Sequence, residues 1–491
     1  MSDADIIIVG SGMGGATLAA GLAPSGLRVL ILERGERLAD CPEARDAAAI
    51  FARGHFRPKE TWLTPEGTPF NPGNYACVGG NSKFYGAVML RYREADFSPI
   101  RHIGGTTPGW PFGYTALAPW YDRAEALYQV RGDAGLDPTE PPRGAPYPFA
   151  PVPHEPAVAD LDRRLRRAGL HPSPLPLALD LDRWLARAAT PWDAFPDTTG
   201  GKLDAETAAL ALALTYPNVR LRTGVTVQRI EAEGDTITGL LTSAGRFAAP
   251  RIVLASGAVH TAALLLRSAD DAHPSGLANR SDQVGRNFMN HNASALLALA
   301  PRRNRSVYQK TLQINDWYLT GGPQGEPLGN VQLLGRVTAP ILAAQTGLPT
   351  PLSRLLANHA LDFYVMSEDL PQADSRVTIK GADIVLDWRR SNWEAHLALV
   401  ARLKAALRRA GYPVLLSKAF DRSTPSHQCG TARLGDDPAS SVTDPFGRSH
   451  DHPNLYICDA SLLPTSAAVN PSLTIAALAL RLADRITQEV A

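Results

Sequence analysis

Two residues near the C-terminal end of the sequence carry groups that suit proton transfer beside a bound ligand. His427 opens the segment His-Gln-Cys-Gly-Thr, and Asn470 opens Asn-Pro-Ser-Leu-Thr. A neutral imidazole can accept a proton near neutral pH, since its unperturbed pKa is about 6.5. A side-chain amide can hold the oxygen that such a proton leaves. His427 is therefore a candidate general base and Asn470 a candidate hydrogen-bonding partner, although Asn470 could instead cap a helix that begins near Ser472.

A second chemistry-bearing pattern stands at the N-terminal end, where glycines follow an apolar run. Residues 6–9 are Ile-Ile-Ile-Val, which predicts a strand buried on both faces, and Gly10, Gly12 and Gly15 follow in GxGxxG spacing. Such glycines permit a tight turn, the approach of a pyrophosphate and close helix packing. A further apolar run ends at Glu33, which stands where an acid roughly 20 residues past the turn binds the adenosine ribose. The order predicts dinucleotide binding and leaves NAD and FAD both open.

The composition argues against several classes of function. The 49 basic and 48 acidic side chains leave a formal net charge of +1, so no bulk field attracts nucleic acid or an anionic membrane. No apolar run reaches the roughly 18 residues that span a bilayer. The four cysteines are too few for a disulfide scaffold, and none pair as CxxC. With no room for a leader before the first strand, we expect a cytoplasmic protein with no membrane span and no nucleic-acid partner.

The strand and helix signals predict two interleaved domains. The fold class is α/β, α+β overall: a Rossmann-like nucleotide-binding domain with an interleaved substrate domain built on an antiparallel sheet. Ser391 is expected to cap the helix after this sheet, with Glu394 as its capping-box partner. The strand candidates of the antiparallel sheet are Ala293–Leu299, Leu312–Leu319, Asn330–Leu334, Asp362–Met366, Arg376–Ile379 and Ile384–Trp388. The predicted boundaries are 1–132, 201–292 and 421–491 for the three parts of the nucleotide-binding domain, 133–200 for a loop or lid region, and 293–420 for the substrate domain.

Further motifs make nearly the whole chain similar to the glucose–methanol–choline (GMC) oxidoreductase family. These motifs are Val78–Ala87, Ser256–Ala262, Val284–Asn287 with His291, and the C-terminal run His427–Gly435, Val442–Pro445, Leu455–Ser461 and Asn470-Pro471. The segment Ser367–Pro371 with Asp374 and Arg376–Thr378 resembles the pyranose-oxidase-like, sugar-oxidising side of the family.

The resemblance implies FAD as the cofactor. The residues that it places around FAD are Gly10, Gly12, Gly14, Gly15, Glu33, Arg34, Gly79, Gly80, Asn81, Ser82, Val227, Ser256, Gly257, Asp459, Ala460, Asn470 and Pro471. Phe84 stands where family members with a histidyl-linked FAD carry the histidine. Because phenylalanine has no nucleophilic nitrogen, we expect non-covalent, dissociable FAD.

The activity implied by the resemblance is FAD-dependent oxidation of an alcohol group, with a sugar, glycoside or other polyol as the favoured small-molecule substrate. His427 would take the hydroxyl proton, Asn470 would hold the same oxygen, and flavin N5 would accept the hydride. Molecular oxygen, a quinone or another carrier could accept the electrons. A redox-silent lyase or a light-driven decarboxylase on the same fold is the alternative, whereas an NAD-dependent reductase or a non-catalytic binding module leaves the C-terminal motif unexplained.

Four other residues receive a plainer interpretation. His450 and His452 lie in a predicted turn, and no metal site is expected there. Cys429 is expected to be a small buried thiol rather than a nucleophile, and His291 to be structural.

Overall fold

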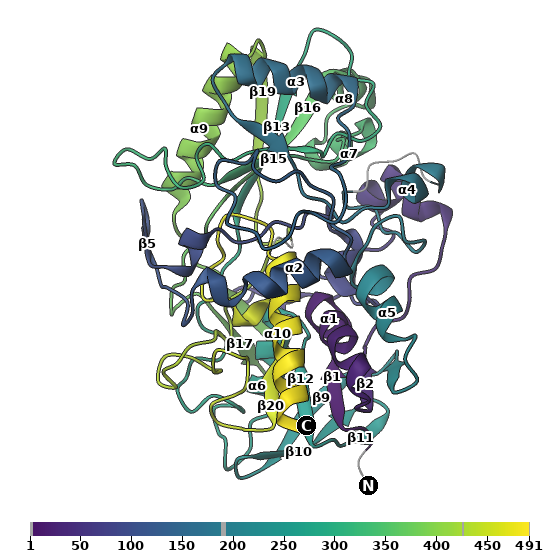
Figure 1. The fold of residues 1–491 in the computed structure, drawn as a ribbon, viewed down its shortest axis with the longest axis vertical. Helices are drawn as coiled ribbons and strands as arrows, with labels where there is room; N and C mark the ends of the chain where they lie inside the picture. The colour runs from purple at the N-terminus through teal and green to yellow at the C-terminus, as the bar shows by residue number, and fades with distance from the viewer. Residues whose placement is uncertain (1–2, 188–192, 425–426, 491) are drawn as a thin grey trace.

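The computed structural model describes residues 3–187, 193–424 and 427–490, which form two sheet-based halves, one above the other in Figure 1. The lower half contains the elements near both ends of the chain, with α1 (Met13–Leu22) beside α10 (Ser472–Val490). The upper half contains an antiparallel sheet covered by helices. The predicted α/β class with an interleaved antiparallel sheet is confirmed.

The lower half is built on a parallel sheet of five strands in the order β20-β12-β1-β2-β8. Its strands are β1 (Ile6–Val9), β2 (Val29–Leu32), β8 (Val219–Arg222), β12 (Arg251–Leu254) and β20 (Leu455–Ile457). Every residue of β1 and β2 is buried, as continuous apolar runs require in a parallel sheet covered on both faces. The sheet thus joins the beginning, the middle and the end of the chain.

The upper half is built on an antiparallel sheet of six strands in the order β19-β13-β16-β15-β14-β7. Its strands are β7 (Pro172–Pro174), β13 (Asn292–Leu299), β14 (Leu312–Ile314), β15 (Asn330–Leu333), β16 (Ala360–Ser367) and β19 (Val414–Ala419). The strand predicted over Leu312–Leu319 ends at Ile314, because a turn closed by the bond from Tyr318 N to Asn315 O follows it. One face of the sheet packs on α3 (Pro156–Arg167) and α9 (Trp393–Arg409).

Two strands predicted for this sheet belong elsewhere. β17 (Arg376–Lys380) and β18 (Asp383–Asp387) pair with each other, and β18 pairs with β3 (Trp62–Leu63), which pairs with β4 (Pro69–Phe70). β17 lies against α6 (Ala258–Arg267) of the lower half. Local alternation predicts a strand but not the sheet that it joins.

The predicted cap at Ser391 is wrong. Helix α9 starts at Trp393, its N-cap position is Asn392 with φ 51°, and no side chain caps it. Ser391 Oγ instead donates to the carboxylate of Asp369 at 2.7 Å, because that buried acid needs donors.

The remaining elements complete the two halves. The other helices are α2 (Ala118–Leu127), α4 (Leu181–Arg187), α5 (Ala211–Ala213), α7 (Ala339–Thr346) and α8 (Thr350–His359). The other strands are β5 (Ile100–His102), β6 (Gly105–Thr107), β9 (Val227–Glu233), β10 (Thr236–Thr242) and β11 (Gly245–Phe247). The short helical turns are η1 (Ala23–Ser25), η2 (Pro42–Arg45), η3 (Ala48–Ala52), η4 (Gly80–Phe84), η5 (Glu94–Phe97), η6 (Tyr114–Ala116), η7 (Ala205–Leu210) and η8 (Ala460–Leu462). The stretch 133–200, predicted as a loop or lid, contains α3, β7 and α4.

Among the described residues, every helix is either too short or too polar to cross a bilayer.

Candidate functional site

A cavity of about 1140 Å³ is lined by residues of both halves. It is larger than a typical ligand site of about 300–1,000 Å³, which leaves room for a dinucleotide and a second molecule. All the residues predicted to contact the cofactor line this cavity except Gly15. Gly15 lies behind the cavity wall, where an added Cβ would stand 2.1 Å from Gly10 O, so it serves helix packing.

The glycine turn fits a pyrophosphate. Gly10 has φ 104°, and a Cβ on Gly14 would lie 1.7 Å from Cys458 O, so both positions need glycine for the backbone itself. A Cβ on Gly12 would meet no protein atom within 4 Å, because Gly12 faces the open cavity. No side chain caps the N-terminus of α1, so its first N–H groups are available to an anion.

Glu33 is held firmly at the end of β2. Its Oε2 accepts from the N and Oγ of Ser11 at 2.9 and 2.7 Å, and its Oε1 accepts from Gly35 N at 2.9 Å. A carboxylate has about four acceptor sites, so about one site of Glu33 remains for a ligand hydroxyl. The next residue, Arg34, also lines the cavity and pairs with Glu60 at 3.0 Å.

The loop expected beside the flavin ring is held by its backbone conformation and by hydrogen bonds between its side chains and the backbone. Gly79 and Gly80 have φ of 85° and 55°, and Ser82 Oγ donates to Gly79 O at 2.6 Å. Asn81 Oδ1 accepts from Tyr75 N at 2.8 Å. These bonds hold the loop as part of the cavity wall.

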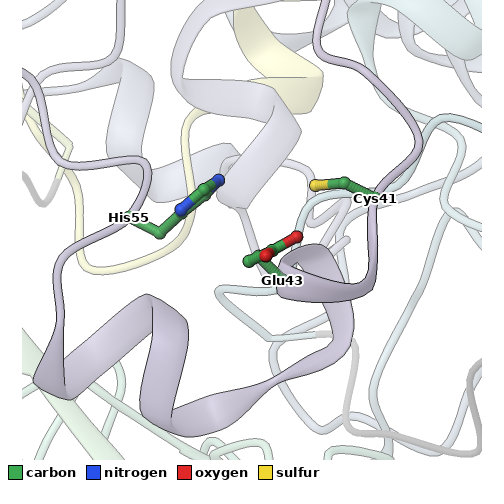
Figure 2. Close-up of side chains that lie close together, drawn as sticks. All are labelled: Cys41, Glu43 and His55. Carbon is green, nitrogen blue, oxygen red and sulfur yellow. The ribbon is translucent and has the colours of Figure 1, made fainter.

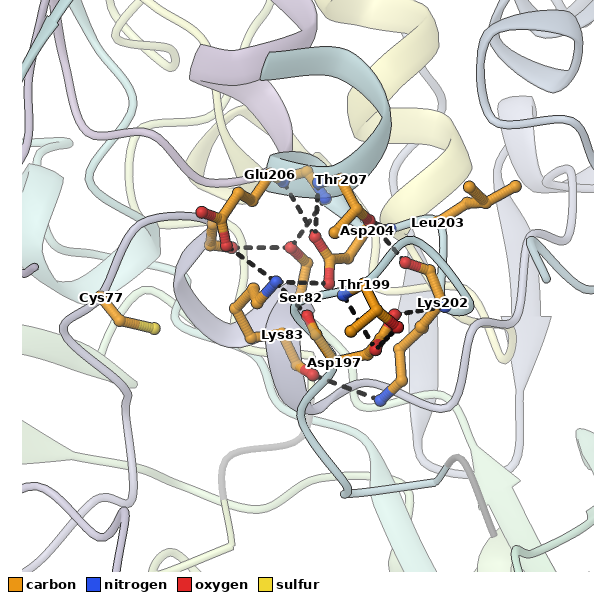
Figure 3. A network of polar contacts seen from close by, with 12 residues as sticks. Cys77, Ser82, Lys83, Asp197, Thr199, Lys202, Leu203, Asp204, Glu206 and Thr207 are labelled. Atoms are coloured by element: carbon orange, nitrogen blue, oxygen red, sulfur yellow. Dashed lines mark hydrogen bonds and ion pairs between the residues drawn. The ribbon is translucent and has the colours of Figure 1, made fainter. Parts of the chain in front are cut away.

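A buried polar network lies behind this loop (Figure 3). Lys83 Nζ lies 3.1 Å from the carboxylate of Asp204 and 2.8 Å from that of Glu206. Lys202 Nζ donates to Tyr85 O at 2.9 Å, and burial lowers the pKa of Lys202 to about 7. Neither lysine lines the cavity, so the network supports the loop rather than contacting a ligand.

Asp459 joins the ends of β20 and α6 at the cavity. Its Oδ2 accepts from Gly257 N at 2.9 Å and from Thr261 Oγ1 at 2.6 Å, and its Oδ1 accepts from Ser461 N at 2.8 Å. Burial raises the pKa of Asp459. Its neighbour Ala460, together with Val227, Ser256 and Pro471, lines the same part of the cavity.

His427 faces a second histidine across a short antiparallel pairing. Met289 and Cys429 exchange two backbone hydrogen bonds of 3.0 Å. His291 and His427 each lie two residues from that pair, so they stand opposite each other on one face. Their Nδ1 atoms are 2.6 Å apart. His427 has φ 60°, a backbone region that non-glycine residues seldom adopt and that is enriched at functional sites.

The contacts of His291 fix the tautomer of His427. His291 Nε2 lies 3.0 Å from Ser466 O and 2.8 Å from Ala467 O, and carbonyls only accept, so Nε2 carries the proton. Burial lowers the pKa of His291 to about 4, which keeps the ring neutral and makes its Nδ1 an acceptor. His427 must therefore donate through Nδ1, and its Nε2 carries the lone pair and can only accept.

A chain of four side-chain amides, which we call the amide chain, reaches the same atom from the other side, and all of them except Asn470 are buried. It consists of Asn470, Gln332, Asn330 and Asn315 and ends at the carboxylate of Asp137. The links are 2.9 Å from Gln332 Nε2 to Asn470 Oδ1, 2.9 Å from Gln332 Nε2 to Asn330 Oδ1, 2.7 Å from Asn330 Nδ2 to Asn315 Oδ1, and 2.7 Å from Asn315 Nδ2 to Asp137 Oδ2.

The carboxylate sets the direction of every bond in the amide chain. Asp137 is ion-paired with Arg93 at 2.5 Å and can only accept, so Asn315 must turn its NH₂ group toward it. Each following amide is then forced into one orientation, and Asn470 must accept through Oδ1. Its Nδ2 therefore faces His427 Nε2, 3.2 Å away, in agreement with the lone pair that His291 places there.

Positive charge and burial keep His427 neutral. Burial, His291 and the charge of Lys310 lower the pKa of His427 well below its ordinary value. Lys310 Nζ lies 2.8 Å from Asp193 and 5.8 Å from the ring centre of Tyr364, and all three side chains line the cavity. The imidazole of His427 is therefore neutral, and its Nε2 can act as a base toward a ligand in the cavity.

Sequence reasoning found His427 and Asn470 but not the groups that orient them. His291 was expected to be structural, and its only signal was its place after the Val284–Asn287 motif. Gln332 gave no signal, since an amide in a strand is not unusual. Cys429 is buried, as predicted, and burial raises the pKa of its thiol well above the ordinary value.

Among the described residues that line the cavity, no group of possible metal ligands is found. Among the described residues one group of possible ligands, Cys41, Glu43 and His55, has its ligand atoms within 4.8 Å of one another (Figure 2). His55 is exposed, and none of the three lines the cavity. His450 and His452 bond separately to Ser441 Oγ and Asp235 O.

Known proteins are similar to this chain in both the N-terminal and the C-terminal segments that line the cavity. A family model described as FAD dependent oxidoreductase matches residues 5–279, and one described as GMC oxidoreductase matches residues 371–479. Paromamine 6'-oxidase of Streptomyces fradiae is 31% identical, covering 99% of this chain and 92% of the relative. The 2-methyl-1,2-propanediol dehydrogenase of Mycolicibacterium austroafricanum is 28% identical, covering 99% and 95%. The crystal structure of pyridoxine 4-oxidase from Mesorbium loti has the same fold, with a TM-score of 0.67 and 21% identity over 98% of this chain and 99% of that one.

Proposed function

The chain belongs to the GMC family of FAD-dependent oxidoreductases, and we propose from its site how it carries out the FAD-dependent oxidation of an alcohol group. The favoured substrates are small hydroxyl-rich molecules such as sugars, glycosides or other polyols. The names of the relatives, which include a paromamine oxidase and a propanediol dehydrogenase, support this class. None of the relatives reported above is named as a lyase or a decarboxylase.

FAD would occupy the part of the cavity between the glycine turn and His427. Bound FAD supplies a flavin ring that can accept a hydride. Gly12 and the start of α1 would hold the pyrophosphate, Glu33 the ribose, and the Gly79–Ser82 loop the flavin. The open space beside Gly12 supports this assignment.

We propose that this FAD is not covalently linked. Phe84 offers no nucleophile, and its ring stacks on Tyr75 with the centres 3.6 Å apart. Precipitating the holoenzyme with acid should release all yellow colour into the supernatant. Flavin fluorescence that stays with the protein pellet would refute the proposal.

His427 is the proposed catalytic base, and the 3.2 Å approach of Asn470 Nδ2 to His427 Nε2 carries the proposal. A substrate hydroxyl that lies beside both atoms, within hydrogen-bond distance of each, can donate its proton to Nε2 while its oxygen accepts from Nδ2. The C–H bond of the same carbon then breaks heterolytically, so the alcohol loses one proton and one hydride and becomes a carbonyl compound. His427 Nε2 gains the proton, while His427 Nδ1 stays hydrogen-bonded to His291.

The test is anaerobic mixing of the holoenzyme with sugars, glycosides, polyols and other alcohols while the visible flavin band is followed. A substrate should bleach the band in the wild type, and His427→Ala should slow bleaching by about 10²- to 10⁴-fold, the usual contribution of a general base. Full turnover by a His427→Ala enzyme that retains FAD would remove His427 from the mechanism. Admitting air to the bleached enzyme then distinguishes molecular oxygen from a quinone or another acceptor.

We also propose a reducing, cytoplasmic setting. The four cysteines are all free, and they are Cys41, Cys77, Cys429 and Cys458. Fractionation of the native cells with an antibody to the protein tests this placement.

A further inference from the structure

The side chains that face the cavity from the upper sheet change from polar to apolar along the strands. Ala295 pairs with Tyr364 and Lys418, and Tyr364 also pairs with Gln332, which places this row at the level of His427. Two residues further along, Leu297 pairs with Leu416. Opposite residues of antiparallel strands share a face, so the second row continues the first away from His427.

Apolar side chains from several elements surround the cavity beyond this second row, a region that we call the outer chamber. Its apolar lining includes Leu297, Leu334, Ile341, Leu342, Leu356 and Leu416. These come from β13, the end of β15, α7, α8 and β19. Asp362, which also pairs with Leu297, does not line the cavity, and its carboxylate accepts from Gln309 Nε2 and Val337 N.

The charged groups of this region already form hydrogen bonds or an ion pair within the protein. Lys310 binds Asp193 at 2.8 Å, Arg336 donates to two backbone carbonyls, and Lys418 donates to Gln345 O at 2.6 Å. Asp193 is the sole carboxylate among the described residues that line the outer chamber and the part of the cavity between the chamber and His427. A substrate body with ammonium groups would therefore lose hydration without gaining a free carboxylate as its counter-charge.

We propose that the outer chamber binds an uncharged, apolar body of the substrate, while the hydroxyl-bearing end reaches His427. The substrate class is then an alcohol or glycoside with an alkyl or aryl substituent, and not a polyamine sugar. This inference rests on the proposed alcohol oxidation at His427.

A series of 1,2-alkanediols from propane- to octanediol tests the chamber with the holoenzyme. The head is constant and the tail grows by one methylene, so kcat/KM should rise about fourfold per methylene until the chamber is filled. The matched charged probe is 8-amino-1,2-octanediol, whose kcat/KM should fall about tenfold or more below that of octanediol. A series that stays flat or falls with length overturns the proposal.

Two neighbouring leucines of α8 give a matched pair of variants. Leu356 lines the chamber, whereas Leu355 is 60% exposed and does not. Leu356→Asp should lower kcat/KM for octanediol and raise it for the amino compound, while Leu355→Asp should leave both unchanged. Equal effects of the two variants would overturn the chamber assignment, and FAD content with thermal unfolding identifies a folding defect.

The outcomes separate this inference from the function on which it rests. Oxidation of the diols without any dependence on tail length overturns the chamber and leaves alcohol oxidation standing. If no diol bleaches the flavin, dissociation constants from the shift of the flavin band replace the rates. Binding that tightens with tail length then supports the chamber although the diols are not oxidised, and binding without such a trend overturns the chamber.

Discussion

Replacing His291 with leucine tests whether a residue that does not touch the substrate controls the catalytic base. His291→Leu removes, from a buried position, the nitrogen that accepts the His427 Nδ1 proton at 2.6 Å. The proton can then move to Nε2, where it occupies the lone pair that the mechanism needs. We therefore expect slower flavin reduction with FAD still bound.

The size of the effect follows from the lost bond. Leaving a buried donor without its acceptor costs about 1–3 kcal/mol, which corresponds to about 5- to 150-fold in an equilibrium or a rate. His291→Leu should thus slow the limiting rate of flavin reduction by about 10- to 100-fold. The loss should stay below that of His427→Ala and appear in the limiting rate rather than in substrate affinity, because His291 acts through His427.

The assay is stopped-flow reduction of the flavin under anaerobic conditions, with His396→Leu as the matched control. His396 is also a fully buried histidine, but it bonds Ser294 and Ser367 on the α9 side of the sheet. Adding His291→Leu to His427→Ala should cause no further loss. The reasoning is refuted if His291→Leu slows reduction no more than His396→Leu, or if the two losses at His291 and His427 simply add.

Three further predictions concern the amide chain, the pH dependence and the glycine turn. Gln332→Glu places an acceptor against Asn470 Oδ1, so flavin reduction should slow by about tenfold or more with FAD retained, as stopped-flow rates will report. Because burial lowers the pKa of His291 to about 4 and both histidines act in their neutral forms, the limiting rate should stay constant from about pH 8 to pH 5 and fall only below that, and a midpoint near 6.5 in the pH–rate profile would contradict this. Gly12→Ala should leave thermal unfolding of the apoprotein unchanged but weaken FAD binding about tenfold or more, measured by fluorescence titration, because its Cβ enters only the open cavity. Gly14→Ala should instead unfold the apoprotein at lower temperature, because its Cβ would lie 1.7 Å from a backbone oxygen.

The nucleotide end of the molecule could be predicted because its signals are local. The apolar run 6–9 and the glycines after it specify a buried strand, a tight turn and a helix within a few residues. Their consequences, such as the open space at Gly12 and the place of Glu33, follow directly from that turn. Ser391 shows the limit of local rules, since the buried carboxylate of Asp369 takes the hydroxyl that the capping pattern assigns to the helix.

The orientation of the proposed catalytic groups could not be predicted because it depends on long-range register. His291 faces His427 only because Met289 pairs with Cys429, 140 positions later in the sequence. Gln332 meets Asn470 only because β15 takes its place beside β16 in the upper sheet. A one-residue shift of either pairing would turn these side chains to the opposite face.

The two hydrogen-bond chains leave the site only one arrangement. Each chain ends on a group that cannot donate: the carbonyls of Ser466 and Ala467 at one end, and the carboxylate of Asp137 at the other. Reversing the His427 ring or the Asn470 amide would put two donors or two acceptors face to face at the next link, so a flip must disrupt a whole buried chain. The loop that supplies the two carbonyls also carries Asn470 three residues later, so one segment sets the tautomer of the base and the position of the amide together. In the mechanism proposed above, the lone pair of His427 is therefore held toward the incoming hydroxyl before substrate binds, and little reorganisation is needed when the proton moves.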